Sequence, residues 1–292
     1  MTPMKDGKID GEGLDKLIEH VLAGGVHGLF LLGTTGEGPS LSQGQKIQMV
    51  RRAGAQVKKR VPIIVAITDT VVEDTLELAQ VCAKAGADAL VVAPPYYLPP
   101  GPAEFLAYLD QLLPALPLPL FLYNMPSMTK VSLDTPTLAE ALARPGVIGV
   151  KDSSGDMGLF HKLLSLRAAE PRPRGWAFFT GSETLLAESV LFGAQGGVCG
   201  GANVDPALFV ELFEAALARR MDRILALQGR LMALSAIYGH GHHASSGIKG
   251  IKCALSLLDV CGDGMAAPFA AFAGPERQQV ARDLGALGLI PR

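Results

Sequence analysis

A lysine at the end of an apolar run is the residue of this sequence best suited to do chemistry. Residues 147–156 read VIGVKDSSGD, so Lys151 follows a stretch typical of a buried strand. Lysine is rarely buried without a partner or a task. Apolar surroundings disfavour its ammonium form, and the free amine can form a Schiff base with a carbonyl substrate. Lys151 is therefore the candidate nucleophile, and the alternative is a structural ion pair, for example with Asp152.

Other polar side chains follow apolar runs, where strands are expected to end. They are Thr34 and Thr35 in GTTGEG, Tyr96 and Tyr97 in PPYY, Tyr123 and Asn124 in YNMP, and Gly181, Ser182 and Glu183 in TGSE. A tyrosine hydroxyl can transfer protons during carbinolamine formation and carbon–carbon bond chemistry. Threonine hydroxyls and the backbone N–H groups of a glycine-rich turn can hold a carboxylate. Together these groups predict an α-keto acid bound as an imine.

Strand and helix patterns alternate along most of the chain, as expected for βαβ units and a parallel sheet. Runs rich in Val, Ile, Leu and Phe lie at 28–33, 61–68, 89–94, 119–124, 147–153, 176–182 and 196–201, and a stub at residues 2–4 makes an eighth. Eight such units in a chain of this length predict an α/β fold, the (β/α)8 TIM barrel. The active site of this fold forms at the carboxyl ends of the strands.

Helix starts between the strands carry capping residues. SQGQ from Ser42 and TVVE from Thr70 are capping-box patterns. Thr135-Pro136 and Asp205-Pro206 each place a cap residue before a proline at the first helical position. We therefore expect helices to begin at these four points.

The last part of the chain contains more helix than one barrel unit needs. Helical patterns cover about 206–239, 246–259 and 274–290. We expect the barrel over residues 1–205, and the final barrel helix with a C-terminal helical extension over residues 206–292. No linker separates them, so the whole chain is expected to form one structural domain.

The bulk composition excludes several classes of function. The 292 residues carry 26 Lys and Arg against 28 Asp and Glu, a net charge of −2, so no surface for nucleic acid is expected. No apolar run approaches the roughly 18–20 residues of a membrane span, and we see no signal peptide. The four cysteines lack metal-type spacing, which predicts reduced thiols, a cytoplasmic location and no metal.

Four motifs in a fixed order carry a family resemblance. GTTGE, PPYY, YNMP and GVKDSSGD, followed by ANVDP, resemble the dihydrodipicolinate synthase and N-acetylneuraminate lyase family of class I aldolases over essentially the whole chain. The resemblance implies no cofactor beyond the covalent imine on Lys151, and pyruvate and an aldehyde as small-molecule partners. It also implies a homo-oligomer built from tight dimers, commonly a tetramer.

The same resemblance implies a role for each site residue. Lys151 would form the imine with pyruvate or with the 2-keto acid that is cleaved, and Tyr123 would transfer protons. Thr34 and Thr35 would bind the substrate carboxylate, and Thr35 would relay protons to Tyr123. Tyr97 would reach into a neighbouring subunit's site, although interface packing is the alternative. The other expected substrate-binding residues are Gly36, Ser153, Gly181, Glu183, Met128 and Val198, the last through its backbone carbonyl.

The sequence departs from the family pattern in three places. The family opens with a complete first strand, where this sequence has only MTPM. The synthase branch has an arginine at the position of Met128, and methionine cannot pair with a substrate carboxylate. Lys130 replaces a small residue, and it is either a solvated loop lysine or a substitute positive charge. Glu183 lies where the lyase branch has an acidic residue for substrate hydroxyls, which favours a polyhydroxy substrate.

These observations predict reversible retro-aldol cleavage of a 2-keto acid, either a sugar acid or a hydroxy-oxo-acid, to pyruvate and an aldehyde. The alternatives are 4-hydroxy-tetrahydrodipicolinate synthase activity on pyruvate and aspartate semialdehyde, and dehydration of a 2-keto-3-deoxy acid. A non-catalytic binding or regulatory barrel is disfavoured by the intact Lys151 and Tyr123. The histidines of YGHGHHASS, His240, His242 and His243, lack the companion ligands expected of a metal site.

Overall fold

The computed structural model describes residues 1–169 and 175–291, in which two compact units are distinguished. The discontinuous unit comprises Met1–Val61 and Cys199–Arg292, and the central unit comprises Pro62–Val198. Each unit is described in turn.

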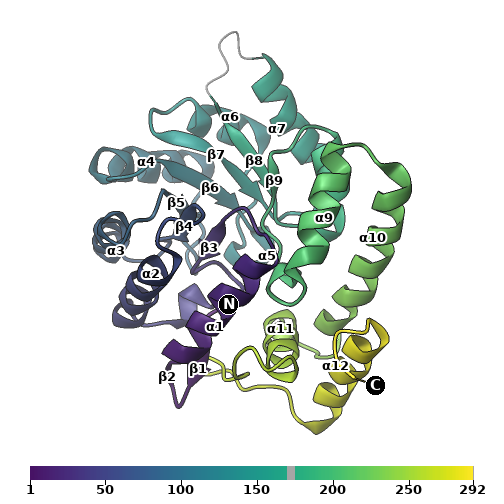
Figure 1. Cartoon of the computed structure of the whole chain (residues 1–292). Helices are drawn as coiled ribbons and strands as arrows, with labels where there is room; N and C mark the ends of the chain where they lie inside the picture. The colour runs from purple at the N-terminus through teal and green to yellow at the C-terminus, as the bar shows by residue number, and fades with distance from the viewer. Residues whose placement is uncertain (170–174, 292) are drawn as a thin grey trace. The chain divides into compact units, whose positions relative to one another are not determined.

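The central unit is built on parallel strands that neighbour one another in chain order (Figure 1). They are β4 (Ile63–Ala66), β5 (Ala89–Val92), β6 (Leu120–Asn124), β7 (Val147–Asp152), β8 (Ala177–Thr180) and β9 (Gly196–Gly197). Every residue of β5 and β6 is buried, as expected for strands covered on both faces. Parallel strands that alternate with helices form the wall of a (β/α)8 barrel, the predicted fold class.

Helices connect these strands. They are α3 (Val72–Lys84), α4 (Pro102–Leu112), α5 (Pro126–Thr129), α6 (Thr135–Leu142), α7 (Met157–Ala169) and α8 (Leu186–Leu191). Two predicted caps are wrong. Asp69, rather than Thr70, accepts the backbone N–H groups just before α3, which begins one residue later than expected. Asp134 caps α6 by accepting the N–H of Thr137, so Thr135 is already helical.

The discontinuous unit contains the strand β3 (Leu29–Leu31) and a hairpin of β1 (Met4–Lys5) and β2 (Lys8–Ile9). The hairpin corrects the prediction of a first barrel strand at residues 2–4, because Met4 pairs antiparallel with Ile9. The reason is the Asp6-Gly7 turn between them, in which both residues have positive φ, 51° and 72°. This conformation is typical of tight hairpin turns.

Helices make up the remainder of the discontinuous unit. They are α1 (Gly11–Ala23), α2 (Gln43–Val57), α9 (Pro206–Leu217), α10 (Met221–Leu234), α11 (Ser246–Leu257) and α12 (Gly274–Ala286). The capping box at Ser42 and the cap at Asp205 are confirmed. The helix expected over 206–239 is two helices, because Arg219 adopts a left-handed conformation with φ of 53°. The predicted C-terminal extension is otherwise helical as expected.

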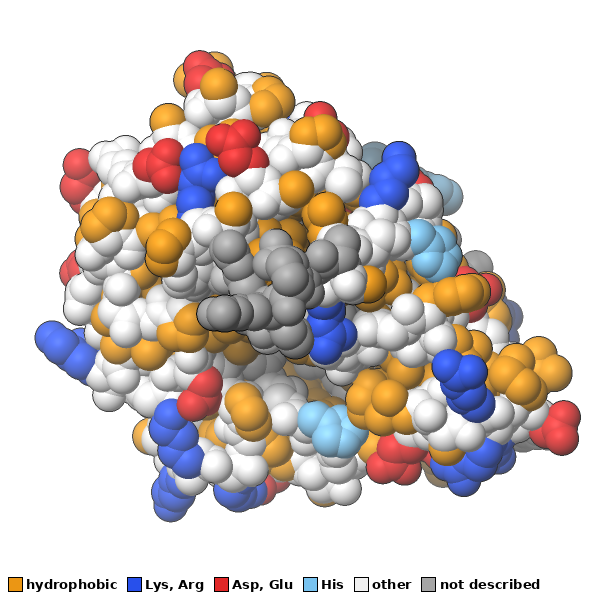
Figure 2. Space-filling model, turned by 90° about the horizontal axis from the view of Figure 1, so that it is seen from above, with side chains coloured by type: hydrophobic (Ala, Val, Ile, Leu, Met, Phe, Trp, Pro, Cys, Tyr) orange, Lys and Arg blue, Asp and Glu red, His pale blue; other side chains and the backbone are white. Residues whose placement is uncertain are grey.

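Two further observations concern the charged surface and the length of the helices. On the described part of the face shown in Figure 2, positive and negative side chains are interspersed rather than segregated by sign. Within residues 1–169 and 175–291, every helix is too short or too polar to span a bilayer.

Candidate active site

Lys151 and Tyr123 lie at the carboxyl ends of adjacent strands. In the parallel register of β6 and β7, Tyr123 is the partner of Lys151. Both residues are buried, with 6% of Lys151 and 5% of Tyr123 exposed. The Nζ atom of Lys151 is 4.2 Å from the centre of the Tyr123 ring. The register of two core strands therefore brings an amine and a phenol together where water has little access.

Gly181 provides the space that the Lys151 side chain occupies. Its N–H donates to the carbonyl of Asp152 (2.6 Å), which holds the end of β8 against β7. A Cβ atom at position 181 would overlap the hydroxyl of Ser153 and lie 2.9 Å from Cε of Lys151. The structure thus brings together three residues singled out in the sequence, Lys151, Ser153 and Gly181, and a larger residue at position 181 would require the side chains of Ser153 and Lys151 to shift.

A buried polar network beside Lys151 was not predicted from the sequence. The Nδ2 group of Asn124 donates to Oδ1 of Asp152 (2.6 Å), and the hydroxyl of Ser154 donates to Oδ2 (2.8 Å). The N–H of Leu133 donates to Oδ1 of Asn124 (3.1 Å). Burial raises the pKa of Asp152 above its ordinary value, although both side-chain hydrogen bonds lower it. The network fixes the ends of β6 and β7; its only sequence signal is a polar residue closing each apolar run.

Glu183 and Val198 follow the next two strands. Glu183 begins a short 3-10 helix (Glu183–Leu185) after β8 and is 9% exposed. The N–H of Val198, just after β9, donates to the carbonyl of Thr180 (2.8 Å). Both residues therefore lie at the same edge of the parallel sheet as Lys151.

Tyr97 and Met128 are exposed in the single chain. Tyr97 is 92% exposed and has a φ of 78°, a conformation rare for a side chain of this size. Its neighbour Leu98 is 79% exposed. Met128, on α5, is 41% exposed. Neither Tyr97 nor Met128 belongs to the buried group around Lys151, and an exposed aromatic on a strained backbone is typical of a contact surface.

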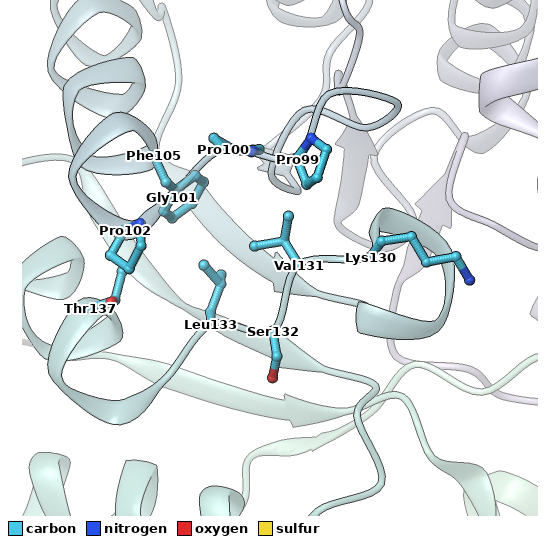
Figure 3. A pocket seen from close by; sticks show the side chains of 10 residues that line it. All are labelled: Pro99, Pro100, Gly101, Pro102, Phe105, Lys130, Val131, Ser132, Leu133 and Thr137. Carbon is cyan, nitrogen blue, oxygen red and sulfur yellow. The ribbon is translucent and has the colours of Figure 1, made fainter.

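A pocket of about 200 Å³ lies between the proline-rich residues 99–102 and the segment 130–133. Figure 3 shows Val131 and Leu133 directed into it, whereas the side chain of Lys130 extends away. The ammonium group of Lys130 donates to the carbonyl of Ser127 (2.6 Å) within the same loop. Lys130 is exposed in this conformation and does not point into the pocket that it borders.

The predicted carboxylate cradle, Thr34, Thr35 and Gly36, forms a turn after β3 in the discontinuous unit. The N–H of Glu37 donates to the carbonyl of Thr34 (3.0 Å) and closes the turn. The hydroxyl of the buried Thr2 donates to the carbonyl of Gly36 (2.6 Å). Both threonines are half-buried and lie in a turn that these hydrogen bonds constrain.

The histidine-rich segment makes a contact within the C-terminal helices. Nε2 of His240 is hydrogen-bonded to Oδ2 of Asp283 on α12, while His242 and His243 are exposed. Across the residues that the structure describes, no three His, Cys, Asp or Glu side chains gather as metal ligands would.

Comparison with known proteins gives one consistent result. A model of the dihydrodipicolinate synthetase family matches residues 1–287. The 4-hydroxy-tetrahydrodipicolinate synthase of Roseobacter denitrificans is 32% identical over 294 residues, covering 99% of this chain and 97% of the relative. The solved structure of dihydrodipicolinate synthase from Bacteroides thetaiotaomicron has a TM-score of 0.93 and 46% identity, covering 98% of this chain and 96% of the other.

A second solved structure is similar over the same length. YagE, a prophage protein of Escherichia coli K12 solved in complex with pyruvate, has a TM-score of 0.91 and 27% identity, covering 99% of this chain and 96% of the other. These two structures confirm the α/β barrel class predicted from the sequence.

Proposed function

The chain belongs to the dihydrodipicolinate synthetase family, and on that premise we propose that it reversibly cleaves a 2-keto acid to pyruvate and an aldehyde. Enzymes of this family are pyruvate-dependent lyases and synthases that work through a Schiff base on a lysine and need no separate cofactor. The chain is therefore a Schiff-base pyruvate aldolase or synthase. The direction of its chemistry and the class of its substrate, a sugar acid or hydroxy-oxo-acid, are what we propose.

The buried pair of Lys151 and Tyr123 carries the proposal. Lys151 is 6% exposed and its Nζ atom lies 4.2 Å from the centre of the Tyr123 ring, so an imine formed on this amine would be held next to the phenol and shielded from bulk water. A phenol beside the same amine can move protons to and from the bound substrate without solvent. A protein that only bound keto acids would need neither group.

The reaction that these residues support begins with attack of the neutral Lys151 amine on the C2 carbonyl carbon. Tyr123 gives its proton to the departing hydroxyl, so that water leaves, an iminium forms and Tyr123 becomes a phenolate. The hydroxyl on C4 gives its proton to Tyr123 through Thr35. The C3–C4 bond then breaks, its electron pair flows toward the iminium nitrogen, and the aldehyde departs. Tyr123 returns the proton to C3 of the resulting enamine, and hydrolysis releases pyruvate and restores the amine.

The remaining site residues bind the substrate in this proposal. Thr34, Thr35 and the N–H of Gly36 hold the carboxylate. Glu183 accepts hydrogen bonds from hydroxyls further along the chain. The residues expected to surround the bound molecule are Ser153, Gly181, Met128 and the carbonyl of Val198.

Met128 favours cleavage of neutral substrates over the synthase reaction. An arginine offers two parallel donors to a carboxylate, whereas a thioether offers none. Lys130 does not replace that arginine in the observed conformation, because its ammonium group is bonded to Ser127. The second candidate, 4-hydroxy-tetrahydrodipicolinate synthase, is favoured by the names of the relatives, among them the 46% identical synthase of Bacteroides thetaiotaomicron.

Steady-state kinetics with pyruvate and a panel of aldehydes would decide between these candidates. We expect hydroxylated and uncharged aldehydes to be condensed well and aspartate semialdehyde poorly. Met128→Arg should improve turnover of aspartate semialdehyde relative to the other aldehydes, and Lys130→Ala should change little. If the unaltered enzyme uses aspartate semialdehyde as well as its best aldehyde, and Lys130→Ala abolishes this, the synthase assignment is correct. Release of water without an aldehyde from a 2-keto-3-deoxy acid would instead identify a dehydratase.

The proposal includes a homo-oligomer in which Tyr97 completes the site of a neighbouring subunit, in a tetramer of two tight dimers. The exposed Tyr97 and Leu98 support it, because large apolar side chains side by side on a surface are typical of an interface. A cytoplasmic location also belongs to the proposal. It is supported by the four cysteines, none of which forms a disulfide among the described residues.

A further inference from the structure

A buried ion pair lies immediately beside the turn that carries Thr34 and Thr35. Glu37 follows this turn, and its carboxylate pairs with the ammonium group of Lys252 on α11. The two side chains are 2% and 1% exposed. Lys252 also donates to the carbonyl of Gly264 (2.6 Å), and the other carboxylate oxygen of Glu37 accepts the N–H of Ala266 (2.9 Å). The pair therefore connects the turn to two segments near the C-terminus, all within the discontinuous unit.

The backbone of Glu37 depends on these contacts. The φ of Glu37, 57°, lies in the left-handed region, which residues other than glycine and asparagine rarely adopt. Its own N–H closes the Thr34 turn. Anchoring the side chain of Glu37 thus restrains the backbone that presents both threonine hydroxyls and the N–H of Gly36.

A second observation places α11 next to the cradle itself. A Cβ atom built on Gly200 would lie 3.6 Å from Oγ1 of Thr35 and 3.1 Å from Cδ1 of Ile251, the residue before Lys252. The Thr35 hydroxyl and α11 are therefore neighbours across Gly200. A shift of α11 would therefore displace the partner of the Glu37 carboxylate and also change the packing next to the Thr35 hydroxyl.

A contribution to folding stability does not by itself explain why the chain has this buried ion pair. Burial lowers the pKa of Lys252, while the carboxylate of Glu37 raises it, so desolvation works against the charged form. Buried ion pairs are often replaceable by apolar residues of similar size without loss of stability. What an ion pair with two further backbone hydrogen bonds provides is one defined geometry.

We propose that Glu37 and Lys252 are positioning residues that hold the Thr34–Gly36 cradle in its carboxylate-binding conformation before the substrate arrives. The inference rests on the proposed Schiff-base function. It predicts that loss of the pair weakens recognition of the substrate carboxylate and leaves the chemistry of Lys151 in place. Binding sites that are rigid before the ligand arrives avoid the entropy of ordering upon binding.

Two carbonyl compounds of similar size separate these effects. Pyruvate carries the carboxylate, whereas hydroxyacetone has a hydroxymethyl group in its place, and both form imines that cyanoborohydride reduces to stable adducts on lysine. Adduct formation at Lys151 would be followed by mass spectrometry against concentration for the unaltered enzyme, Glu37→Gln and Lys252→Met. We expect the half-saturating pyruvate concentration to rise about 10-fold or more in both variants, as for loss of charge-assisted positioning. The value for hydroxyacetone should change by less than about twofold.

Two controls exclude general destabilisation. Val50→Ala removes buried volume from α2 in the same unit, at a residue 2% exposed, without touching the ion pair. This variant should lower the melting temperature and leave the half-saturating pyruvate concentration unchanged. The double variant Glu37→Gln/Lys252→Met removes both charges, so it should melt above Lys252→Met and still bind pyruvate weakly.

Each outcome has a definite meaning. An unaltered enzyme that forms no pyruvate adduct on Lys151 overturns the proposed function and this inference with it. An adduct that forms equally well in the unaltered enzyme and in both single variants overturns the inference alone. Equal shifts for pyruvate and hydroxyacetone, reproduced by Val50→Ala, would show that the pair acts only on stability and would also overturn it.

Discussion

Replacing Gly181 by alanine tests whether the position of the Lys151 side chain limits imine formation. The added methyl group would overlap the hydroxyl of Ser153 and lie 2.9 Å from Cε of Lys151. Ordinary contact begins at 3.4 Å, so the end of the lysine side chain must move by about half an ångström, and Ser153 by more. Because the N–H of Gly181 is bonded to the carbonyl of Asp152, the backbone cannot easily move away instead.

The size of the effect follows from these distances. Overfilling a packed site costs about 1–3 kcal/mol of unfolding free energy. A misplacement of about 1 Å at a reacting group lowers the rate about 100-fold, so half that displacement predicts a loss of about 10-fold or more in imine formation. The melting temperature and the rate should therefore both fall in Gly181→Ala.

The assay is the rate of cyanoborohydride-trapped adduct formation with pyruvate, combined with thermal unfolding. Ser153→Ala/Gly181→Ala removes the overlap with the hydroxyl but keeps the 3.0 Å approach to Cβ of residue 153, so it should recover part of the lost stability while imine formation stays slow. Gly229→Ala is the matched control, because a methyl group on this glycine of α10 meets nothing within 4 Å. Imine formation at the normal rate in Gly181→Ala would refute the placement of Lys151 against Gly181.

Three further predictions concern other parts of the site. Tyr123→Phe should lower kcat about 10²–10⁴-fold with little change in KM, because it removes proton transfer; a normal kcat with a raised KM would make Tyr123 a binding residue. Asp152→Asn should become more stable relative to the unaltered protein as pH rises from about 4 to 7, measured by urea unfolding, because the raised pKa of Asp152 means that its ionisation disfavours the fold; a pH-independent difference would contradict this. Tyr97→Ala should lower kcat while adduct formation at Lys151 persists, and a fully active monomer in analytical ultracentrifugation would show that Tyr97 has no role across an interface.

The parts of the fold that were predicted correctly depend on local sequence. Parallel core strands are short apolar runs between capped helices, so the barrel class and the strand-end positions of Lys151 and Tyr123 follow from periodicity. The errors arose where a single turn or cap residue determines how an element pairs or where a helix begins. The Asp6-Gly7 turn folds the expected first strand into a hairpin. Ahead of α3, the backbone N–H of Val71 donates to the side chain of Asp69 and not to that of Thr70.

Two features of the site could not be predicted, because they depend on residues distant in the sequence. The Asn124–Asp152 hydrogen bond joins two strands, and the Glu37–Lys252 pair joins a turn near the start of the chain to a helix near its end. A single sequence shows each residue's type but not its partner. The sequence marks Glu37 only as the last residue of the GTTGE motif. The pattern around Lys252 does not distinguish it from a solvent-exposed helix lysine.

The discontinuity of one unit has a consequence for how the chain folds during its synthesis. Pro62–Val198 is a continuous stretch, whereas the other unit needs Met1–Val61 together with Cys199–Arg292. The ribosome therefore finishes the central unit first, and the early residues must wait for partners such as Lys252 that are made near the end. We expect the Thr34 turn to be protease-sensitive in ribosome-bound chains that stop before α11 and protected in complete chains. Truncation before α11 would then leave the Thr34 turn without the anchor that Lys252 provides.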